Sequence, residues 1–354
     1  MKQKIAIAFG GKSPEHQVSL HSATTICNAL DQSQFDVILL GNDRKGAWYY
    51  NVDYVKEHID LAIDDYFEHA REVYMQENQG GGVFFDSQTH ELLASFSVVF
   101  PIIHGIFGED GCLQGFFNFL GIPFVGSGVL GSSICMDKEI TKRVLRDNGI
   151  PITRFICLNK ANKETVSFEE VVNELGNPFF VKPCNAGSSF GVSKVDKKAD
   201  FKTAIALAFQ FDKKILLEEA VEGKEIECSV LGNEFPISSV LGEITTTTGF
   251  YSYDVKYWNT SRATLCIPAE IPVEISNKIR VCAIHAYRAT CCEGFARVDF
   301  FLKANGNFVV NEINTLPGFT AYSMYPKLFE YAGLSIQKVV SRLIALALET
   351  KERN

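Results

Sequence analysis

Residues 295–319 read FARVDFFLKANGNFVVNEINTLPGF, and this stretch decides how the C-terminal part of the chain is interpreted. Two apolar runs flank Asn305-Gly306, a dipeptide that is the strongest short-range signal for a β-hairpin. Asn and Gly both tolerate the positive φ angles of a type I′ turn. If these two residues form the turn, counting outward along the strands places Asp299 directly opposite Glu312.

The same register gives the predicted hairpin one polar face. Residues two apart on a strand share a face, so Arg297 and Asn314 join the facing pair Asp299 and Glu312. Facing like charges destabilise a sheet unless a cation joins them. Carboxylate and amide oxygens suit Mg²⁺, which usually keeps waters and substrate phosphates as its other ligands. We predict a hard-metal site; the alternative is a solvated strand face, which the TLPG break at 315–318 makes less favourable.

Bulk properties restrict the function classes. The chain has 354 residues, which suits two or three domains, and its 46% hydrophobic and 21% charged residues are ordinary for a folded soluble protein. A net charge of −8 argues against a general nucleic-acid surface. Ten scattered cysteines without a CxxC pair argue against zinc. Without a signal peptide or an apolar run of membrane length, we expect a cytoplasmic protein with free thiols and no membrane partner.

The order of the expected elements predicts an α/β fold that becomes α+β in its C-terminal part. Apolar strands at 4–9, 35–40 and 97–103, with a helix at 18–29, indicate a doubly wound parallel N-terminal domain. The polar stretch 51–95 resembles a variable insertion within it.

A second unit is expected from residue 137 onward. MDKEITKRVLRDNGI predicts a helix, and the segments that follow predict strands at 153–158, 177–182, 214–218 and 227–231 and a final helix at 336–349. No Pro- or Ser-rich linker marks a boundary. We expect domains at 1–136, 137–228 and 229–354.

The Gly/Ser-rich loop NAGSSFG at 185–191 lies between two predicted strands. Small residues let backbone N–H groups approach an anion, and the hydroxyls of Ser188 and Ser189 add donors. Lys182 ends the preceding strand and can neutralise a phosphate there, and Lys138 is a similar candidate. The loop is neither a Walker A loop nor a GxGxxG fingerprint, so a structural turn is the alternative.

Other polar positions follow predicted strands. Residues 218–221 end an apolar strand whose edge can read adenine, and Glu225 can take ribose hydroxyls, with a solvated acidic turn as the alternative. Glu15 follows the first strand, where an α/β sheet binds ligands, although an acid at a helix N-terminus explains it equally. His104 also ends a strand and suits either a structural or a functional role. The aromatic and charged segment 249–257 is typical of a lid.

Together these motifs resemble the D-alanine–D-alanine ligase family of ATP-grasp enzymes. They occur in the family's order and extend from Ile5 to Pro326, leaving only the polar stretch 51–95 outside the resemblance. The matching segments are FGGKSPEHQVSL, HGIFGEDGCLQG, MDK, VKPCNAGSSFGV, LLEEAVEGKE, FYSYDVKY, ARVDFFL and NEINTLPGFTAYSMYP. The resemblance implies an N-terminal substrate-binding domain, a central ATP-grasp lobe, and a C-terminal lobe with the metal site and lid.

The resemblance also implies a role for each matched position at the nucleotide and the metal. Two Mg²⁺ ions, for which Mn²⁺ can substitute, would be held by Asp299, Glu312 and Asn314, with Glu312 bridging them. The nucleotide residues would be Lys138, Lys182, Ser188 and Ser189 at the phosphates, Glu218, Glu219 and Val221 at adenine, Glu225 at the ribose, and Phe180 and Phe301 on the two faces of the base.

For the amino acids, the resemblance implies that Glu15 binds the ammonium of the first D-alanine, linked by hydrogen bonds to Ser188 and Tyr257. It further implies an oxyanion site at Arg297 and the Gly318 N–H. Ser323 and, on the lid, Lys256 would help to hold the second substrate and the transferring phosphate.

The expected reaction joins two D-alanines through a D-alanyl phosphate, with release of ADP and phosphate, and serves peptidoglycan precursor synthesis. Dimers are usual in the family that the sequence resembles, and we expect a homodimer here. Tyr257 matches the dipeptide-forming pattern, whereas Met324 replaces a small aliphatic residue near the second substrate. D-Serine or D-lactate as second substrate, another ATP-grasp ligase, and a non-catalytic nucleotide-binding regulator are the alternatives; the last would be expected to lose Arg297 or a metal ligand.

Overall fold

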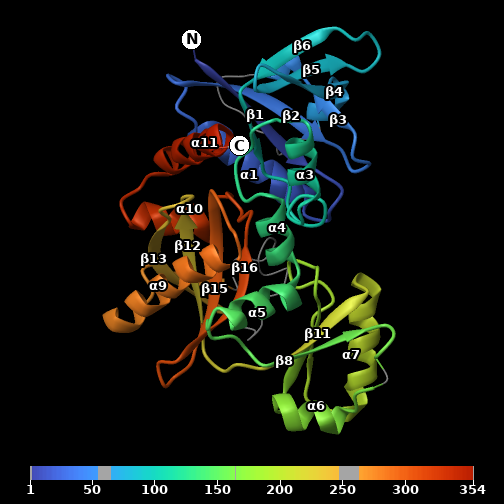
Figure 1. Cartoon of the computed structure of the whole chain (residues 1–354), viewed down its shortest axis with the longest axis vertical. Helices are drawn as coiled ribbons and strands as arrows, with labels where there is room; N and C mark the ends of the chain where they lie inside the picture. Colours follow the sequence, from blue (N-terminus) through green and yellow to red (C-terminus); the bar gives the residue numbers. More distant parts are fainter. Residues whose placement is uncertain (1, 55–64, 164, 247–262, 354) are drawn as a thin grey trace.

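The computed structural model describes residues 2–54, 65–163, 165–246 and 263–353. Within these ranges the strands form three sheets, which we call the N-terminal, central and C-terminal sheets. The N-terminal sheet lies at the top of Figure 1, the C-terminal sheet below it, and the central sheet at the far end of the long axis. The α/β fold with two further lobes, expected from the sequence, is confirmed.

The N-terminal sheet has a parallel centre. Its strands β1 (Gln3–Gly10), β2 (Phe35–Asn42) and β7 (Val98–Pro101) pair in parallel, and α1 (His16–Ala29) connects the first two. These elements lie where the sequence predicted them. Their apolar residues alternate between two cores, because both faces of a parallel sheet are covered.

The polar stretch 51–95, interpreted from the sequence as a variable insertion, contributes strands to the N-terminal sheet. Its described residues, 51–54 and 65–95, extend the same sheet through antiparallel pairings, which the prediction of a parallel domain did not include. Gln79 and Gly80 both have positive φ angles, so the turn between β4 and β5 has the type I′ form, which matches the twist of the flanking strands. The added strands are β3 (Trp48–Tyr50), β4 (Arg71–Asn78), β5 (Gly81–Asp86) and β6 (Leu92–Phe96), with η1 (Val52–Tyr54) and α2 (Asp65–Glu68) between β3 and β4.

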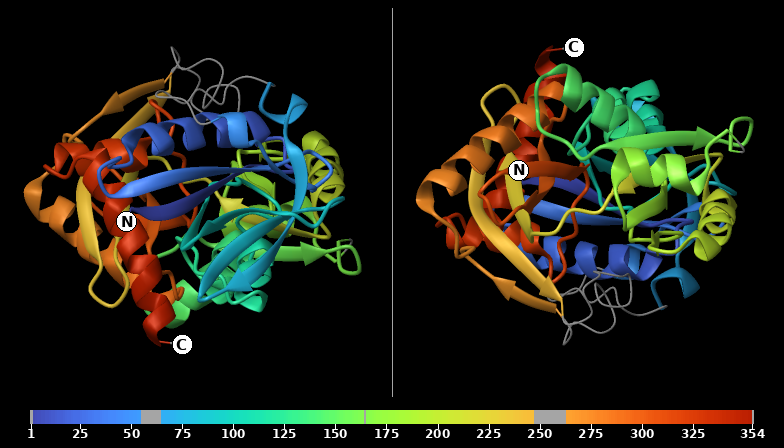
Figure 2. Two further views of the ribbon diagram at one scale, coloured as in Figure 1. Left: turned by 90° about the horizontal axis from the view of Figure 1, so that it is seen from above. Right: turned by 90° about the horizontal axis from the view of Figure 1, so that it is seen from below.

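The last helix of the chain completes the N-terminal core. In α11 (Ile336–Arg353), the buried face includes Val339, Val340 and Leu343, which pack in one cluster with side chains of β1 and α1. Figure 2 shows this red helix beside the blue strands. The opposite face of the sheet is covered by α3 (Cys112–Phe119), which leads through α4 (Val129–Met136) and α5 (Lys138–Asp147) to the central sheet.

The central sheet has one apolar and one polar face. Its order is β10 (Ser193–Val195), β9 (Phe179–Pro183), β11 (Lys214–Glu219) and β8 (Phe155–Asn159), all antiparallel. Alternate residues pack against α6 (Phe168–Leu175) and α7 (Lys198–Phe211). The intervening residues of the same strands project from the opposite, polar face; they include Phe180, Lys182 and Glu218.

The C-terminal sheet follows at Lys224, so the domain boundary expected at 228 falls inside a strand. Its apolar face packs on α9 (Val273–Ala289), and α10 (Met324–Tyr331) packs against β12 and β13. The antiparallel order is β14 (Ala263–Cys266), β13 (Ile237–Thr246), β12 (Lys224–Leu231), β15 (Phe295–Leu302) and β16 (Phe308–Asn314).

The β15–β16 hairpin has the predicted facing pairs but a different turn. Asp299 faces Glu312, as predicted. The loop, however, has three residues, 304–306, and of these described residues only Gly306 has a positive φ, at 82°. The type I′ turn predicted at Asn305-Gly306 is therefore wrong. One extra residue on β16, Asn311, forms a bulge that offsets the longer loop, so the register at the polar face is restored.

Among the described residues, no single helix combines the length and the hydropathy needed to cross a membrane. The bent pair α10 and α11, which meets at 108°, passes that test only by its combined length and composition.

Candidate active site

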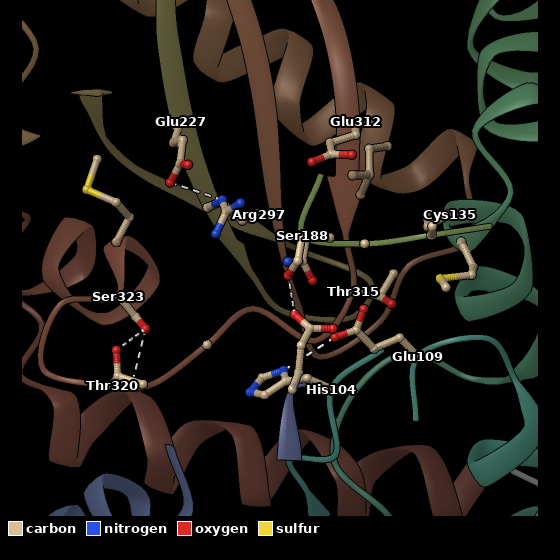
Figure 3. A pocket seen from close by; sticks show the side chains of 18 of the residues that line it. His104, Glu109, Cys135, Ser188, Glu227, Arg297, Glu312, Thr315, Thr320 and Ser323 are labelled. Atoms are coloured by element: carbon tan, nitrogen blue, oxygen red, sulfur yellow. Dashed lines mark hydrogen bonds and ion pairs between the residues drawn. The ribbon is translucent and has the colours of Figure 1, made fainter. Parts of the chain in front are cut away.

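A polar cavity lies where the three sheets approach one another (Figure 3). The N-terminal unit contributes Glu15 and His104, and the loop after β9 contributes Ser188. The remaining wall comes from α5, from β12, from the β15–β16 hairpin and from the segment that follows the hairpin. These further lining residues include Lys138, Glu227, Arg297, Glu312, Asn314, Gly318, Thr320 and Ser323.

Arg297 is held between two carboxylates on the polar face of the C-terminal sheet. Its Nε and Nη2 donate to the two carboxylate oxygens of Asp299 at 2.7 Å each, and Nε also lies 3.0 Å from Glu227 Oε2 on β12. Burial by itself disfavours the charge, but Asp299 and Glu227 raise the pKa of Arg297 well above its usual value. The guanidinium is therefore a fixed positive charge at the cavity wall.

Lys138 joins the hairpin to the Gly/Ser-rich loop. Its Nζ donates to the carbonyl of Ala186 at 2.9 Å and lies 3.4 Å from Glu312 Oε2. The helix that carries it begins at an Asp137 cap, whose carboxylate accepts the backbone N–H groups of Glu139 and Ile140. This cap fixes the first turn of α5. The Lys138 ammonium is thereby placed between the Gly/Ser-rich loop at 185–191 and the carboxylate of Glu312.

A buried ion cluster lies on the polar face of the central sheet. Glu218 is 4% exposed, and its Oε2 lies 2.5 Å from Lys182 Nζ. Its Oε1 pairs with the Nζ of Lys142, which also donates to Thr153 Oγ1 at 2.6 Å. Burial alone would raise the pKa of Glu218, but the two ammonium groups lower it to about 2. The carboxylate is therefore ionised throughout the neutral range.

The two lysines of this cluster differ in their electrostatics. Burial lowers the pKa of Lys142 despite the neighbouring Glu218. Burial also opposes the charge on Lys182, but the attraction of Glu218 outweighs it and raises the pKa of Lys182. Lys182 is therefore the more strongly protonated of the two.

The loop at 185–191 has a strained backbone. Ser188 and Ser189 have φ angles of 51° and 60°, a left-handed conformation that is uncommon for residues other than Gly and costs on the order of 1–3 kcal/mol each. Asn185 anchors the start of the loop, because its backbone N–H and Nδ2 both donate to Asp212, at 2.8 and 2.9 Å. Such strain is typical of ligand-binding loops.

Glu15 meets this loop from the N-terminal unit. Ser188 Oγ donates to Glu15 Oε1, a contact between residues 173 positions apart in the chain. The backbone N–H of Glu15 donates to Ser13 Oγ at 3.1 Å, which fixes the start of α1. Gly105 packs against the same carboxylate, because a Cβ there would lie 2.7 Å from Glu15 Oε2. The carboxylate thus lies between two segments that are distant from it in the chain, the Gly/Ser-rich loop and the segment at Gly105.

His104 is buried beside this carboxylate. Its Nδ1 donates to Glu109 Oε1 at 3.3 Å, and its Nε2 lies 3.3 Å from Ser22 Oγ. The Ser22 hydroxyl also accepts the N–H of Phe319 at 3.2 Å. His104 and Ser22 therefore tie the segment after the hairpin to the N-terminal unit, which favours the structural role left open by the sequence.

The segment after β16 presents Gly318 and Ser323 to the cavity. Ser323 Oγ accepts the N–H of Thr320 at 2.9 Å and lies 2.8 Å from Thr320 Oγ1. A Cβ at Gly318 would lie 2.8 Å from Ser323 Oγ, so a side chain there would disturb this turn. The turn at 320–323 therefore packs closely against Gly318, which lines the cavity.

The residues expected at the nucleotide base lie on the facing sheets. Phe180 on β9 and Phe301 on β15 are half-buried, and Glu225 is paired with Phe301 across β12 and β15. Glu219 holds Arg154 through a 2.8 Å ion pair. Because the carboxylates of Glu218 and Glu219 are engaged by cations, any base contact at 218–221 falls to the main chain there.

The structure brings together most of the predicted residues and adds others. Lys256 and Tyr257, predicted on the lid, lie outside the described residues. Lys142, Thr153 and Glu227 were not predicted. The spacing of Lys138 and Lys142, four residues apart on one helix face, is the signal in the sequence that indicates a second cation.

Comparisons with known proteins cover nearly the whole chain. Residues 4–127 match the family model described as D-ala D-ala ligase N-terminus, and residues 144–345 match D-ala D-ala ligase C-terminus. D-alanine–D-alanine ligase A of Salmonella typhimurium is 48% identical, with 100% of this chain and 98% of the relative covered. The same-named protein of Escherichia coli K12 is also 48% identical, with 98% and 96% covered.

Solved structures give the same picture. VanG D-Ala:D-Ser ligase from Enterococcus faecalis has a TM-score of 0.87 at 36% identity, covering 98% of this chain and 100% of that chain. The D-alanine–D-alanine ligase from Coxiella burnetii has a TM-score of 0.87 at 33% identity, covering 99% of this chain and 95% of that chain.

Proposed function

Because the chain belongs to the D-alanine–D-alanine ligase family, we propose that it joins two D-alanines and converts ATP to ADP and phosphate in the same reaction. Its product, D-alanyl-D-alanine, would enter peptidoglycan precursor synthesis. One structural observation carries the proposal most directly. The contact between Glu15 and Ser188 unites a carboxylate suited to an ammonium with a loop suited to phosphate, so an amino acid and a nucleotide can meet there.

We propose that ATP lies between the central and C-terminal sheets. Lys138 and Lys182 would neutralise its phosphates, and the strained loop with Ser188 and Ser189 would cover them. The arrangement supports this role, because Lys138 already donates to a loop carbonyl and lies beside the facing carboxylates. The base-contacting residues would be the main chain of Glu218, Glu219 and Val221, the rings of Phe180 and Phe301, and, at the ribose, Glu225.

We propose Asp299, Glu312 and Asn314 as ligands of two Mg²⁺ ions, with Mn²⁺ able to substitute. Within the described residues, no group of three or more His, Cys, Asp or Glu side chains is arranged to hold a metal. Two carboxylates and an amide fit Mg²⁺, which takes few protein ligands and completes its shell with phosphates and waters. The bound metal would neutralise the developing charge on the phosphates.

In the first half-reaction, the carboxylate of the first D-alanine would attack the γ-phosphorus of ATP, forming D-alanyl phosphate and releasing ADP. Glu15 would hold the substrate ammonium, with Ser188 fixing the carboxylate of Glu15 and Tyr257 completing the hydrogen bonds. Lys138 and Lys182 would stabilise the negative charge on the phosphate oxygens, which is the main source of catalysis in phosphoryl transfer.

In the second half-reaction, the amine of the second D-alanine would attack the acyl carbon, lose a proton, and expel phosphate. Arg297 and the Gly318 N–H would stabilise the oxyanion; such a donor is typically worth about 3–4 kcal/mol. The two carboxylates around Arg297 support this role, because they keep it charged and fixed. Ser323 and Lys256 would hold the second substrate and the transferring phosphate.

Product analysis tests the choice of second substrate. The purified protein is offered D-alanine alone with Mg-ATP, and then D-alanine with D-lactate or D-serine, and the products are identified by mass spectrometry. We expect D-alanyl-D-alanine as the main product in every mixture. A predominant D-alanyl-D-serine or D-alanyl-D-lactate product would assign the second-substrate pocket to the alternative class.

We further propose that the protein is a cytoplasmic homodimer. Phe119 on α3 and Leu130 on α4 are 91% and 61% exposed on adjoining helices, which supports an apolar contact surface. Sedimentation analysis would give a dimer for the native chain. A monomer across the micromolar range would contradict the proposal.

A further inference from the structure

A buried charge cluster lies on the polar face of the central sheet, and one of its members has no role in the proposed reaction. Lys142 on α5 is 1% exposed, and its Nζ donates to Thr153 Oγ1 at 2.6 Å. The same ammonium pairs with Glu218 Oε1, to which the Thr153 hydroxyl also donates. A buried ammonium is tolerated only when its partners compensate for the lost hydration.

The two oxygens of Glu218 have different partners. Oε1 faces Lys142 and Thr153, whereas Oε2 lies 2.5 Å from Lys182 Nζ. A carboxylate that is bound at one oxygen by two donors has a fixed plane. The direction of Oε2, and hence the place of the Lys182 ammonium, therefore depends on the contacts made by Oε1.

The charges of the cluster also favour an anion. The two ammonium groups share the Glu218 carboxylate, so these three groups together carry a surplus positive charge, and Glu312 is the next carboxylate that acts on both lysines. Lys182, which is 8% exposed, is the member nearer to solvent and to the Gly/Ser-rich loop that follows β9. A phosphate arriving at Lys182 would offset this surplus charge.

We propose that Lys142 is a positioning residue for nucleotide binding, which acts on ATP through Glu218 and Lys182 without touching the nucleotide. Lys142 and Thr153 hold Glu218, and Glu218 aims Lys182 at the phosphates. The inference rests on the proposed function, since it assumes that Lys182 contacts ATP. The inference gives α5 two roles. Lys138 approaches the phosphates directly, and Lys142, one turn later, acts on them through Glu218 and Lys182.

The test replaces Lys142 by a neutral side chain of similar length, Lys142→Met. We expect the KM for ATP to rise about 10- to 100-fold, as for a displaced positioning group. The KM for D-alanine should change by less than about twofold, because Glu15 and its neighbours are untouched. The dissociation constant for a non-hydrolysable ATP analogue, measured by calorimetry, should rise by the same factor as the KM for ATP.

Two further variants separate this inference from the proposed function. Arg143→Met is the matched control, because Arg143 is the exposed neighbour of Lys142 on the same helix and should leave both KM values unchanged. Lys182→Met tests the premise and should weaken binding of the ATP analogue at least as much as Lys142→Met. An unchanged affinity in Lys182→Met would refute the role of Lys182; an effect in Lys182→Met without one in Lys142→Met would refute the positioning role alone.

A purely structural role for Lys142 predicts a different pattern. In that case Lys142→Met would lower the melting temperature and affect the KM values of ATP and D-alanine alike, which would overturn the proposal. If Lys142→Met does not fold, Thr153→Val removes the hydroxyl that bridges Lys142 and Glu218 while retaining shape and charge. This variant should raise the KM for ATP selectively, and equal effects on both substrates would again overturn the proposal.

Discussion

At the scale of single residues, the cationic side chains of the site are held in place by ion pairs with neighbouring carboxylates. Arg297 is held by Asp299 and Glu227, and Lys182 is held by Glu218. Buried ion pairs of this kind contribute little net stability, but the loss of one partner leaves a costly buried charge. They are consistent with a site in which ammonium and guanidinium groups are preorganised for phosphate and oxyanion.

Replacing Glu312 by Gln tests the proposed bridging role. Glu312→Gln keeps the size of the side chain but removes the negative charge that is proposed to bridge the two Mg²⁺ ions. We therefore expect activity to fall at least about a hundredfold while the melting temperature changes little. Steady-state kinetics and thermal unfolding measure the two effects. Glu330→Gln, at an exposed position on α10, is the control and should retain activity. Near-normal turnover of Glu312→Gln would exclude the bridging role.

The buried carboxylate of Glu218 predicts a pH dependence of stability. Its pKa falls from an ordinary value of 4.5 to about 2 on folding, so its contribution is fully present above pH 4.5 and is lost as the pH falls toward 2. The shift corresponds to about 3 kcal/mol. Urea unfolding between pH 6 and 2, in steps of about half a unit, should show the gap between the native chain and Glu218→Gln shrinking over that window. A constant gap would contradict the assignment.

At the scale of elements, the hairpin shows what local sequence does and does not determine. The alternation of polar and apolar residues in β15 and β16 predicted the polar face, because the apolar face must meet α9. The turn was not predictable in the same way. A three-residue loop and the Asn311 bulge each shift the register by one residue, and the two shifts cancel at Asp299 and Glu312. Neither shift has a signal as strong as the Asn-Gly dipeptide.

The structure of this loop predicts which of its residues is sensitive to substitution. Only Gly306 requires a left-handed conformation, so Gly306→Ala should reduce the free energy of unfolding by about 1–2 kcal/mol without abolishing activity. Chemical denaturation measures the change. Asn305→Asp, which keeps the side-chain acceptor for the N–H of Asn307, should have little effect. An unaltered stability of Gly306→Ala would argue against the observed loop.

At the scale of the whole molecule, the site exists only because distant segments meet. Glu15, Ser188 and Gly318 come from three parts of the chain, and motif order indicated their association through a family resemblance rather than through any local pattern. The i, i+4 spacing of Lys138 and Lys142 indicates a second cation on α5, but its partners Glu218 and Thr153 could not be identified from the sequence, because they lie far from it along the chain. The extension of the N-terminal sheet by β4, β5 and β6 was likewise not predicted, since hydropathy alone does not give strand pairing.

The C-terminal helix predicts a coupling between the two ends of the chain. Leu343 on α11 is fully buried in the core shared with β1 and α1, so Leu343→Ala should destabilise the protein by about 2–5 kcal/mol. Calorimetric unfolding measures the loss. KM values below the unfolding temperature should stay near those of the native chain, because the helix lies away from the cavity. A selective change in KM without loss of stability would contradict this structural role.

The most direct test of the central claim is the ratio of phosphate released to dipeptide formed. With Mg-ATP and D-alanine, we expect one phosphate for each D-alanyl-D-alanine, and phosphate release should be negligible when either D-alanine or the divalent metal is omitted. A folded, purified sample that releases phosphate without any dependence on D-alanine, or that forms no dipeptide, would contradict the assignment as a D-alanine–D-alanine ligase.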